Sequence, residues 1–131
     1  MAITTGARRG ELLSLRWNSL DIDKQTAYVL TSKNGEPKVL PLTDSVIKEL
    51  RVFNSNDGSL IFSSEIKPDK PYFFFKQWNR VREEAELIDF RFHDLRHTCA
   101  SYLAKSGAYL LEIADVLGHM QIEVTKYYLL I

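Results

Sequence analysis

Six residues of this sequence are of the types that phosphodiester chemistry requires when no metal ion takes part. They are Arg8, Lys33, His93, Arg96, His119 and Tyr128. A phosphodiester under attack passes through a five-coordinate state and gathers negative charge on its non-bridging oxygens. Planar guanidinium groups neutralise that charge through paired hydrogen bonds, so Arg8 and Arg96 are suited to this task.

The other four residues can supply a nucleophile and proton transfer. A tyrosine ester of phosphate is itself a phosphodiester, so attack by the Tyr128 hydroxyl conserves the bond energy and needs no ATP. Lys33 can protonate the departing oxygen if neighbouring cations lower its pKa. His93 and His119 can bind phosphate oxygens or accept the tyrosine proton, because imidazole titrates near neutrality.

Taken singly, each of these residues also has an ordinary structural explanation. Arg8 at a helix start is typical of a solvated side chain, and Lys33 beside a turn is typical of an exposed one. His93 can cap a helix, Arg96 can pair with a nearby carboxylate, and Tyr128 can be a core aromatic. The combination is what indicates a site, because together the six residues supply every part of the reaction.

The elements that must position these residues are mainly helices. Apolar periodicity with capping residues predicts helices over about 7–18, 44–53, 71–86, 94–105, 109–117 and 122–130. Two strand-like runs, 26–32 and 37–42, are joined across Asn34-Gly35 and predict a β-hairpin, and 60–63 can add a short strand. We expect one α+β domain over residues 1–131, mainly helical, with a small antiparallel sheet packed on a helical bundle.

The composition is that of an ordinary globular protein, with 131 residues, 45% hydrophobic and 26% charged side chains. The net charge of +0 does not by itself suggest a nucleic-acid partner. The one cysteine, Cys99, is expected to be a buried core residue, and no metal site or cofactor is expected. Apolar runs are too short to cross a bilayer, so the sequence predicts no membrane association and a cytoplasmic location.

Five motifs in order resemble those of the tyrosine recombinase (phage integrase) family. The stretch Thr5-Gly6-Ala7-Arg8-Arg9-Gly10-Glu11-Leu12 resembles the first arginine box, in which the acid supports the phosphate-binding arginine. Lys33 lies eight residues before Pro41, as in the family's lysine hairpin. His93-Asp94-Leu95-Arg96 resembles the His-x-x-Arg box, and Leu117-Gly118-His119 resembles the third box. Tyr128 is nine residues after that histidine, where the family has its nucleophile.

The resemblance implies the catalytic domain of a site-specific DNA recombinase or integrase, which cleaves and rejoins strands through a 3′-phosphotyrosine intermediate without a metal. It implies double-stranded DNA as partner and a tetramer on DNA for the full-length parent. Glu11 takes a supporting role. Tyr127 competes with Tyr128 and is interpreted as a packing residue, while Lys38 competes with Lys33 and lies where the family often has a basic residue near DNA.

Two other functions fit parts of the pattern. A type IB topoisomerase shares this chemistry, but the compact first box and the Leu117-Gly118-His119 spacing favour the recombinase. A non-catalytic DNA-binding relic would have no need for a hydroxyl nucleophile. Because the resemblance starts at the first arginine box, residues 1–131 are expected to be a fragment that lacks the family's amino-terminal DNA-clamping domain and carboxy-terminal tail.

Overall fold

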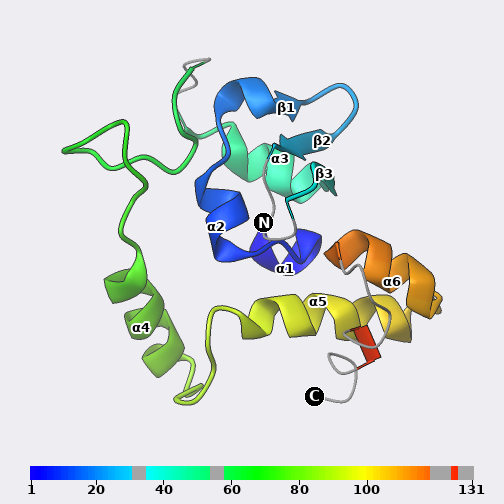
Figure 1. Cartoon of the computed structure of the whole chain (residues 1–131). Helices are drawn as coiled ribbons and strands as arrows, with labels where there is room; N and C mark the ends of the chain where they lie inside the picture. Colours follow the sequence, from blue (N-terminus) through cyan, green and yellow to red (C-terminus); the bar gives the residue numbers. More distant parts are fainter. Residues whose placement is uncertain (31–34, 54–57, 119–124, 127–131) are drawn as a thin grey trace.

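The computed structural model describes residues 1–30, 35–53, 58–118 and 125–126. Its helices and strands are, in order, α1 Ala2–Thr5, α2 Arg9–Leu13, the 3-10 helix η1 Trp17–Ser19, β1 Leu20–Asp21, β2 Thr26–Val29, β3 Lys38–Pro41, α3 Asp44–Leu50, α4 Phe75–Glu84, α5 Asp94–Lys105 and α6 Leu110–Leu117. Figure 1 shows the small sheet with α2 and α3 above α1, and α5 and α6 below it. The prediction of a mainly helical α+β fold with a small antiparallel sheet is confirmed.

The sheet has the strand order β1-β2-β3, and both pairings are antiparallel. Ala27 of β2 pairs with Leu40 of β3, and Val29 pairs with Lys38. Ala27, Val29 and Leu40 face inward and are buried, whereas Tyr28 is exposed, which is the alternation expected of a half-buried strand. The predicted hairpin is therefore confirmed in its paired residues, while its turn, with Lys33, lies outside the described ranges.

A hydrophobic core joins this sheet to α2 and α3. Its buried residues are Ala7, Leu12, Leu15, Ala27, Val29, Leu40, Leu42, Val46, Ile47, Leu50 and Ile61. Helix α3 begins after Thr43, whose Oγ1 accepts the N–H of Val46 at 3.3 Å, as an N-cap should. The helix ends at Leu50, three residues before the predicted end.

The predicted helix over 7–18 is wrong. Helix α2 covers only Arg9–Leu13, and the backbone beyond it pairs with a distant segment. The Leu15 carbonyl accepts the N–H of Ile61 at 3.0 Å, and the N–H of Trp17 donates to the Ser59 carbonyl at 3.1 Å. These tertiary hydrogen bonds remove the backbone of residues 15–17 from the helix. In place of the strand predicted at 60–63, the structure has two isolated bridges, which join Leu60 to Arg16 and Ser63 to Pro71.

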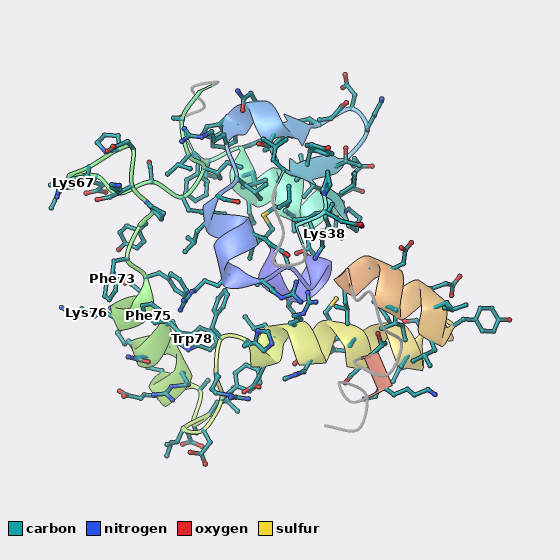
Figure 2. The ribbon with its side chains drawn as sticks, viewed as in Figure 1. Lys38, Lys67, Phe73, Phe75, Lys76 and Trp78 are labelled. Atoms are coloured by element: carbon teal, nitrogen blue, oxygen red, sulfur yellow. The ribbon has the colours of Figure 1, made fainter. Side chains whose placement is uncertain are left out.

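Helix α4 begins at Phe75 rather than near Pro71, because Pro71 forms a bridge with Ser63. The helix is held by aromatic contacts to the segment before α5. The Phe74 and Trp78 rings lie 4.9 Å and 5.3 Å from that of Phe92. Figure 2 labels Phe73, Phe75 and Trp78, which gather at the start of α4.

Helices α5 and α6 form the second packed unit and meet α1 at its end. Helix α5 has the predicted bounds, and α6 begins one residue later than predicted. Ala100, Ile113 and Leu117 are the buried residues between them. Gly118 ends α6 in the left-handed conformation at φ 70°, as predicted for a glycine cap.

Of the helix predicted over 122–130, only Thr125 and Lys126 lie within the described ranges, and both are helical. Among the described residues, no helix combines the length and the apolar character needed to span a membrane.

Candidate active site

The first part of the candidate site lies where α1 ends and α2 begins. Arg8 is the N-cap of α2, and its own N–H donates to Glu11 Oε2 at 2.9 Å. The Arg8 guanidinium donates to Glu11 Oε1 at 3.3 Å. Glu11 is only 4% exposed, so its carboxylate is a fixed acceptor. The predicted supporting role of Glu11 thus has a geometric basis, since it holds both the backbone and the side chain of Arg8.

Burial alone would raise the pKa of the Glu11 carboxyl. The Arg8 N–H and the ammonium of Lys38 more than offset that effect, so the pKa lies below its usual value. Glu11 is therefore a carboxylate at neutral pH, and its charge is compensated by the cations around it.

Arg96, in the first turn of α5, is the largest fully buried side chain among the described residues, at 1% exposure. Its two terminal nitrogens donate to two backbone carbonyls, that of Gly6 at the end of α1 and that of Leu117 at the end of α6. A planar guanidinium is suited to bridge two acceptors in this way. Arg96 therefore ties the ends of α1 and α6 to α5, a structural role that the sequence did not indicate.

Gly6 is needed at this junction for two reasons. Its φ of 66° lies in the left-handed region, and a Cβ there would come within 2.8 Å of Leu117 Cδ2 and 3.2 Å of Cys99 Sγ. The absence of a side chain lets α1 lie directly on α5 and α6. Cys99 is buried, as predicted.

Lys38, the first residue of β3, points into the site rather than toward solvent, and its side chain is 8% exposed. Its ammonium lies 3.1 Å from Glu11 Oε2 and 3.5 Å from the Leu117 carbonyl oxygen. Figure 2 shows it between the sheet and the helices below. In this structure the charge of Lys38 is paired with the Glu11 carboxylate of α2.

His93 immediately precedes α5 and makes no side-chain capping hydrogen bond, so the simple capping explanation does not hold. Partial burial, followed by the charges of His97, Arg96 and Arg8, lowers its pKa below the usual value. The neutral imidazole is therefore favoured at neutral pH, and it can accept a proton. His93 and Arg96 are adjacent at the start of α5, where the Arg96 N–H donates to the His93 carbonyl at 3.1 Å.

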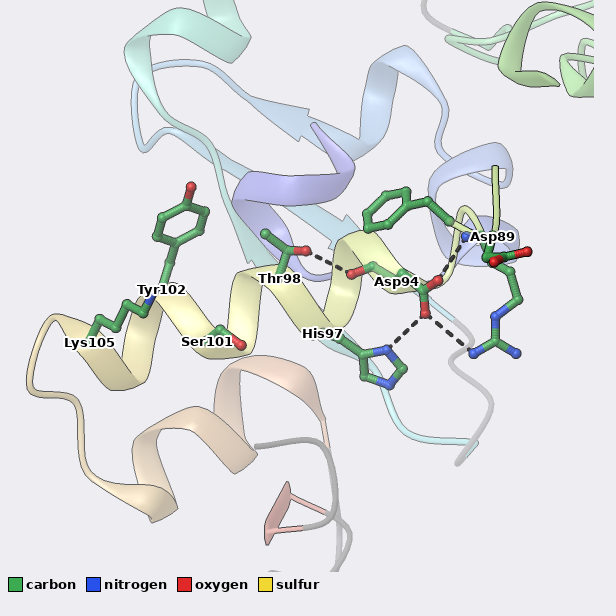
Figure 3. A pocket seen from close by; sticks show the side chains of 9 residues that line it. Asp89, Asp94, His97, Thr98, Ser101, Tyr102 and Lys105 are labelled. Carbon is green, nitrogen blue, oxygen red and sulfur yellow. Dashed lines mark hydrogen bonds and ion pairs between the residues drawn. The ribbon is translucent and has the colours of Figure 1, made fainter. Parts of the chain in front are cut away.

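His93 lies beside a hydrogen-bonded network around Asp94. The rings of His93 and His97 lie 5.3 Å apart and nearly perpendicular. Asp94 holds His97 through Oδ1 at 3.2 Å and accepts the N–H of Arg91 through Oδ2 at 2.7 Å. Figure 3 shows this network at the edge of an open hollow along the outer face of α5. The carboxylate of Asp94 is thus engaged by Arg91 and His97, whereas Arg96 binds carbonyls.

The structure brings together Arg8, Glu11, His93 and Arg96, and adds Lys38, which sequence reasoning had set aside. The predicted site residues Lys33, His119 and Tyr128 lie outside the described ranges, as does Tyr127. Arg8 and Lys38 pair with the Glu11 carboxylate, and Lys38 and Arg96 share the Leu117 carbonyl. Three cations thus gather around one carboxylate and a helix end, which makes a locally positive site on a chain with no net charge. Within the part of the chain that the structure describes, no group of three or more His, Cys, Asp or Glu could hold a metal ion.

Comparison with protein families matches residues 1–130 to the phage integrase family. Similar curated proteins include the integrase of Salmonella phage P22, 29% identical over 97% of this chain and 36% of the relative. The shufflon-specific DNA recombinase of Escherichia coli is 29% identical over 98% of this chain and 32% of the relative. The tyrosine recombinase XerA of Saccharolobus solfataricus is 30% identical over 98% of this chain and 43% of the relative. The chain thus spans less than half the length of these relatives.

Solved structures with the same fold include XerA recombinase, with a TM-score of 0.76 and 22% identity over 96% of this chain and 48% of that one. The catalytic domain of bacteriophage HP1 integrase has a TM-score of 0.72 and 22% identity, over 97% of this chain and 68% of that one. XerH recombinase bound to its difH substrate has a TM-score of 0.75 and 24% identity, over 97% of this chain and 40% of that one.

Proposed function

This chain belongs to the phage integrase family, and on that basis we propose that it is the catalytic domain of an enzyme that breaks and rejoins DNA through a 3′-phosphotyrosine on Tyr128. The observation that carries the proposal is the convergence of Arg8 and Arg96. These arginines come from boxes almost ninety residues apart in the sequence, and Lys38 connects them. Its ammonium shares the Glu11 carboxylate with Arg8 and the Leu117 carbonyl with Arg96.

The described residues supply the part of the site that binds a phosphodiester. The Arg8 side chain is 20% exposed and fixed by Glu11, so its guanidinium can donate to a non-bridging oxygen. Arg96 is 1% exposed, so it contributes positive electrostatic potential to the site from the protein interior. Direct contact between Arg96 and a phosphate would require local rearrangement when DNA binds.

The reaction itself forms one bond and breaks one. The Tyr128 oxygen bonds to phosphorus while the bond from phosphorus to the 5′ oxygen breaks. The tyrosine proton passes to a neutral imidazole, for which His93 and His119 are the candidates, and the departing 5′ oxygen takes a proton from Lys33. Reversal of these steps with the 5′ hydroxyl of another duplex completes the strand exchange. No metal ion takes part in this scheme.

The partners follow from the same proposal. Double-stranded DNA is the substrate, and the full-length parent acts as a tetramer on DNA in the cytoplasm. XerH has been solved bound to its difH substrate, and an integrase of the Tn1549 transposon has been solved with transposon right end DNA. These relatives support DNA as the substrate class for the present chain.

A suicide substrate tests the proposal directly. A DNA site with a nick near the scissile phosphate loses a short fragment after cleavage and traps the covalent intermediate. The full-length protein that carries this domain should give an adduct that survives denaturation. The same adduct should form when cleavage is carried out in excess EDTA. Tyr128→Phe should abolish the adduct and Tyr127→Phe should retain it. Absence of any adduct would identify a non-catalytic relic, and an adduct that never transfers to a second duplex would indicate a topoisomerase.

A further inference from the structure

Lys38 is buried in a way that an ordinary strand lysine is not. Its side chain is 8% exposed, although lysine is almost never fully buried unless its charge is paired. The backbone at Gly118 comes close to it, since a Cβ there would lie 3.5 Å from Lys38 Cδ and 3.7 Å from Nζ. The fold therefore encloses this ammonium between β3, α2 and the end of α6.

The first partner of Lys38 is the carboxylate that fixes Arg8. Glu11 uses Oε1 for the Arg8 guanidinium, and it uses Oε2 for both the Arg8 N–H and the Lys38 ammonium. Two groups thus meet at one oxygen. Because a carboxylate is planar, fixing Oε2 also fixes the direction in which Oε1 presents itself to Arg8.

The second partner is the Leu117 carbonyl, which also accepts from Arg96. The last carbonyls of a helix carry partial negative charge and have no partner within the helix, so cations are favourable there. Lys38 reaches this carbonyl from the sheet, and Arg96 reaches it from α5. Together they fix the carboxyl end of α6 at Leu117.

We propose that Lys38 is a positioning residue, which links the segments that carry Arg8 and Arg96 to the end of α6, and which neither donates the proton to the leaving oxygen nor contacts DNA. The proposal rests on the proposed function of the site. Burial lowers the pKa of Lys38, the Glu11 carboxylate opposes that effect, and the charges of Arg96 and Arg8 add to it. A lysine in such surroundings has the properties of a general acid as well, so the test must separate the two roles.

The test compares variants of the full-length protein on two cleavage substrates. One substrate has the natural bridging 5′ oxygen, and the other has sulfur there, which leaves as a thiolate without a proton. Lys38→Met removes the ammonium, and Lys38→Arg keeps a cation that can reach Glu11. Lys48→Met, at an exposed lysine of α3, is the matched control. Unfolding temperatures are measured first, so that rates are compared well below unfolding.

Lys38→Met should slow single-turnover cleavage about 10- to 100-fold, the cost that loss of a group orienting a ligand has at metal sites. The rate of cleavage should fall by the same factor on the oxygen substrate and on the sulfur substrate. Lys38→Arg should recover most of the rate. The slope of DNA affinity against salt concentration should not change, because no phosphate contact is lost. Recovery of Lys38→Met on sulfur would identify Lys38 as the acid, and a shallower salt slope would identify a DNA contact. Either result, or unchanged cleavage, overturns the proposal.

A readout without DNA separates this proposal from the proposed function. Amide hydrogen exchange over residues 110–118 should increase in Lys38→Met and stay unchanged in Lys48→Met, whether or not the protein cleaves DNA. If the parent protein forms no adduct but this exchange effect is present, only the proposed function fails. If Lys38→Met does not fold, Lys38→Gln replaces it in the cleavage, salt and exchange measurements. Glutamine keeps a donor for Glu11 but has no charge. Unchanged exchange in a folded variant contradicts the positioning role.

Discussion

Gly6, which caps the end of α1, and Leu117, the last residue of α6, are bound by the same guanidinium. Their carbonyls accept the two terminal nitrogens of Arg96, and a Cβ on Gly6 would lie 2.8 Å from Leu117 Cδ2. The arrangement makes the junction of α1, α5 and α6 depend on one small residue and one buried charge.

Gly6→Ala should therefore destabilise the domain by two separate effects. A left-handed φ costs about 1–2 kcal/mol for a residue with a Cβ, and the clash adds about 1–3 kcal/mol. Gly107→Ala is the control, because Gly107 also has a positive φ but no heavy atom within 4 Å of an added Cβ. Urea unfolding should show a larger loss for Gly6→Ala, and equal losses would show that packing against Leu117 is unimportant.

Arg96→Lys should be nearly as harmful as removal of the side chain. One ammonium does not reproduce a planar group that reaches two carbonyls, so we expect a loss of about 3 kcal/mol or more in unfolding free energy. Arg8→Lys should leave stability almost unchanged, since Arg8 is partly exposed, while covalent adduct formation falls in both variants. Wild-type stability in Arg96→Lys would contradict the bridging role of the guanidinium.

Glu11 should contribute a stability that depends on pH in a definite direction. Because its folded pKa lies below the usual value of 4.5, its stabilising effect is complete above that value and is lost as pH falls through the folded pKa. Glu11→Gln should therefore be clearly less stable than the native protein at pH 7, and the difference should shrink as the pH falls below 4.5 and through the folded pKa. Urea unfolding across this range measures the difference, with Glu49→Gln on α3 as control. A difference that does not depend on pH would place the effect in packing rather than charge.

Lys33 remains the candidate for the general acid. Lys33→Ala should slow cleavage of the oxygen substrate by about 10²- to 10⁴-fold. On the sulfur substrate it should recover most of its rate, in contrast to Lys38→Met, because a thiolate leaves without a proton. A rapid-quench assay on both substrates measures the two factors. An equally large defect on both would leave Lys33 with a purely electrostatic role.

Local signals in the sequence were sufficient for part of the fold and the site. The paired strands of the hairpin follow from alternating side chains around Asn34-Gly35, and the bounds of α5 and the cap at Gly118 follow from periodicity and glycine. Arg8, Glu11, His93 and Arg96 were recognised from motifs, and the fold brings them together. Lys33, His119 and Tyr128 stay predictions.

What the sequence could not indicate depends on contacts between distant segments. Leu15 leaves the helical pattern because Ile61, far along the chain, donates to its carbonyl. A lysine in a strand ordinarily faces solvent, and the partner of Lys38 lies 27 residues earlier in the sequence. Arg96 bridges two backbone carbonyls. Every residue has a backbone carbonyl, so no sequence motif can indicate which two are bridged.

The close approach of α1 to α5 at Gly6 also gives this chain an intrinsic chemical reporter. Cys99 is the one cysteine of the sequence, and its sulfur lies beneath Gly6. Burial raises the pKa of its thiol, the charges of Arg96 and Lys38 only partly opposing this, so little thiolate is present and alkylating reagents reach it slowly. The rate of Cys99 alkylation therefore measures how often the two helices separate, and a change in that rate when DNA is added would time the opening of the junction in solution.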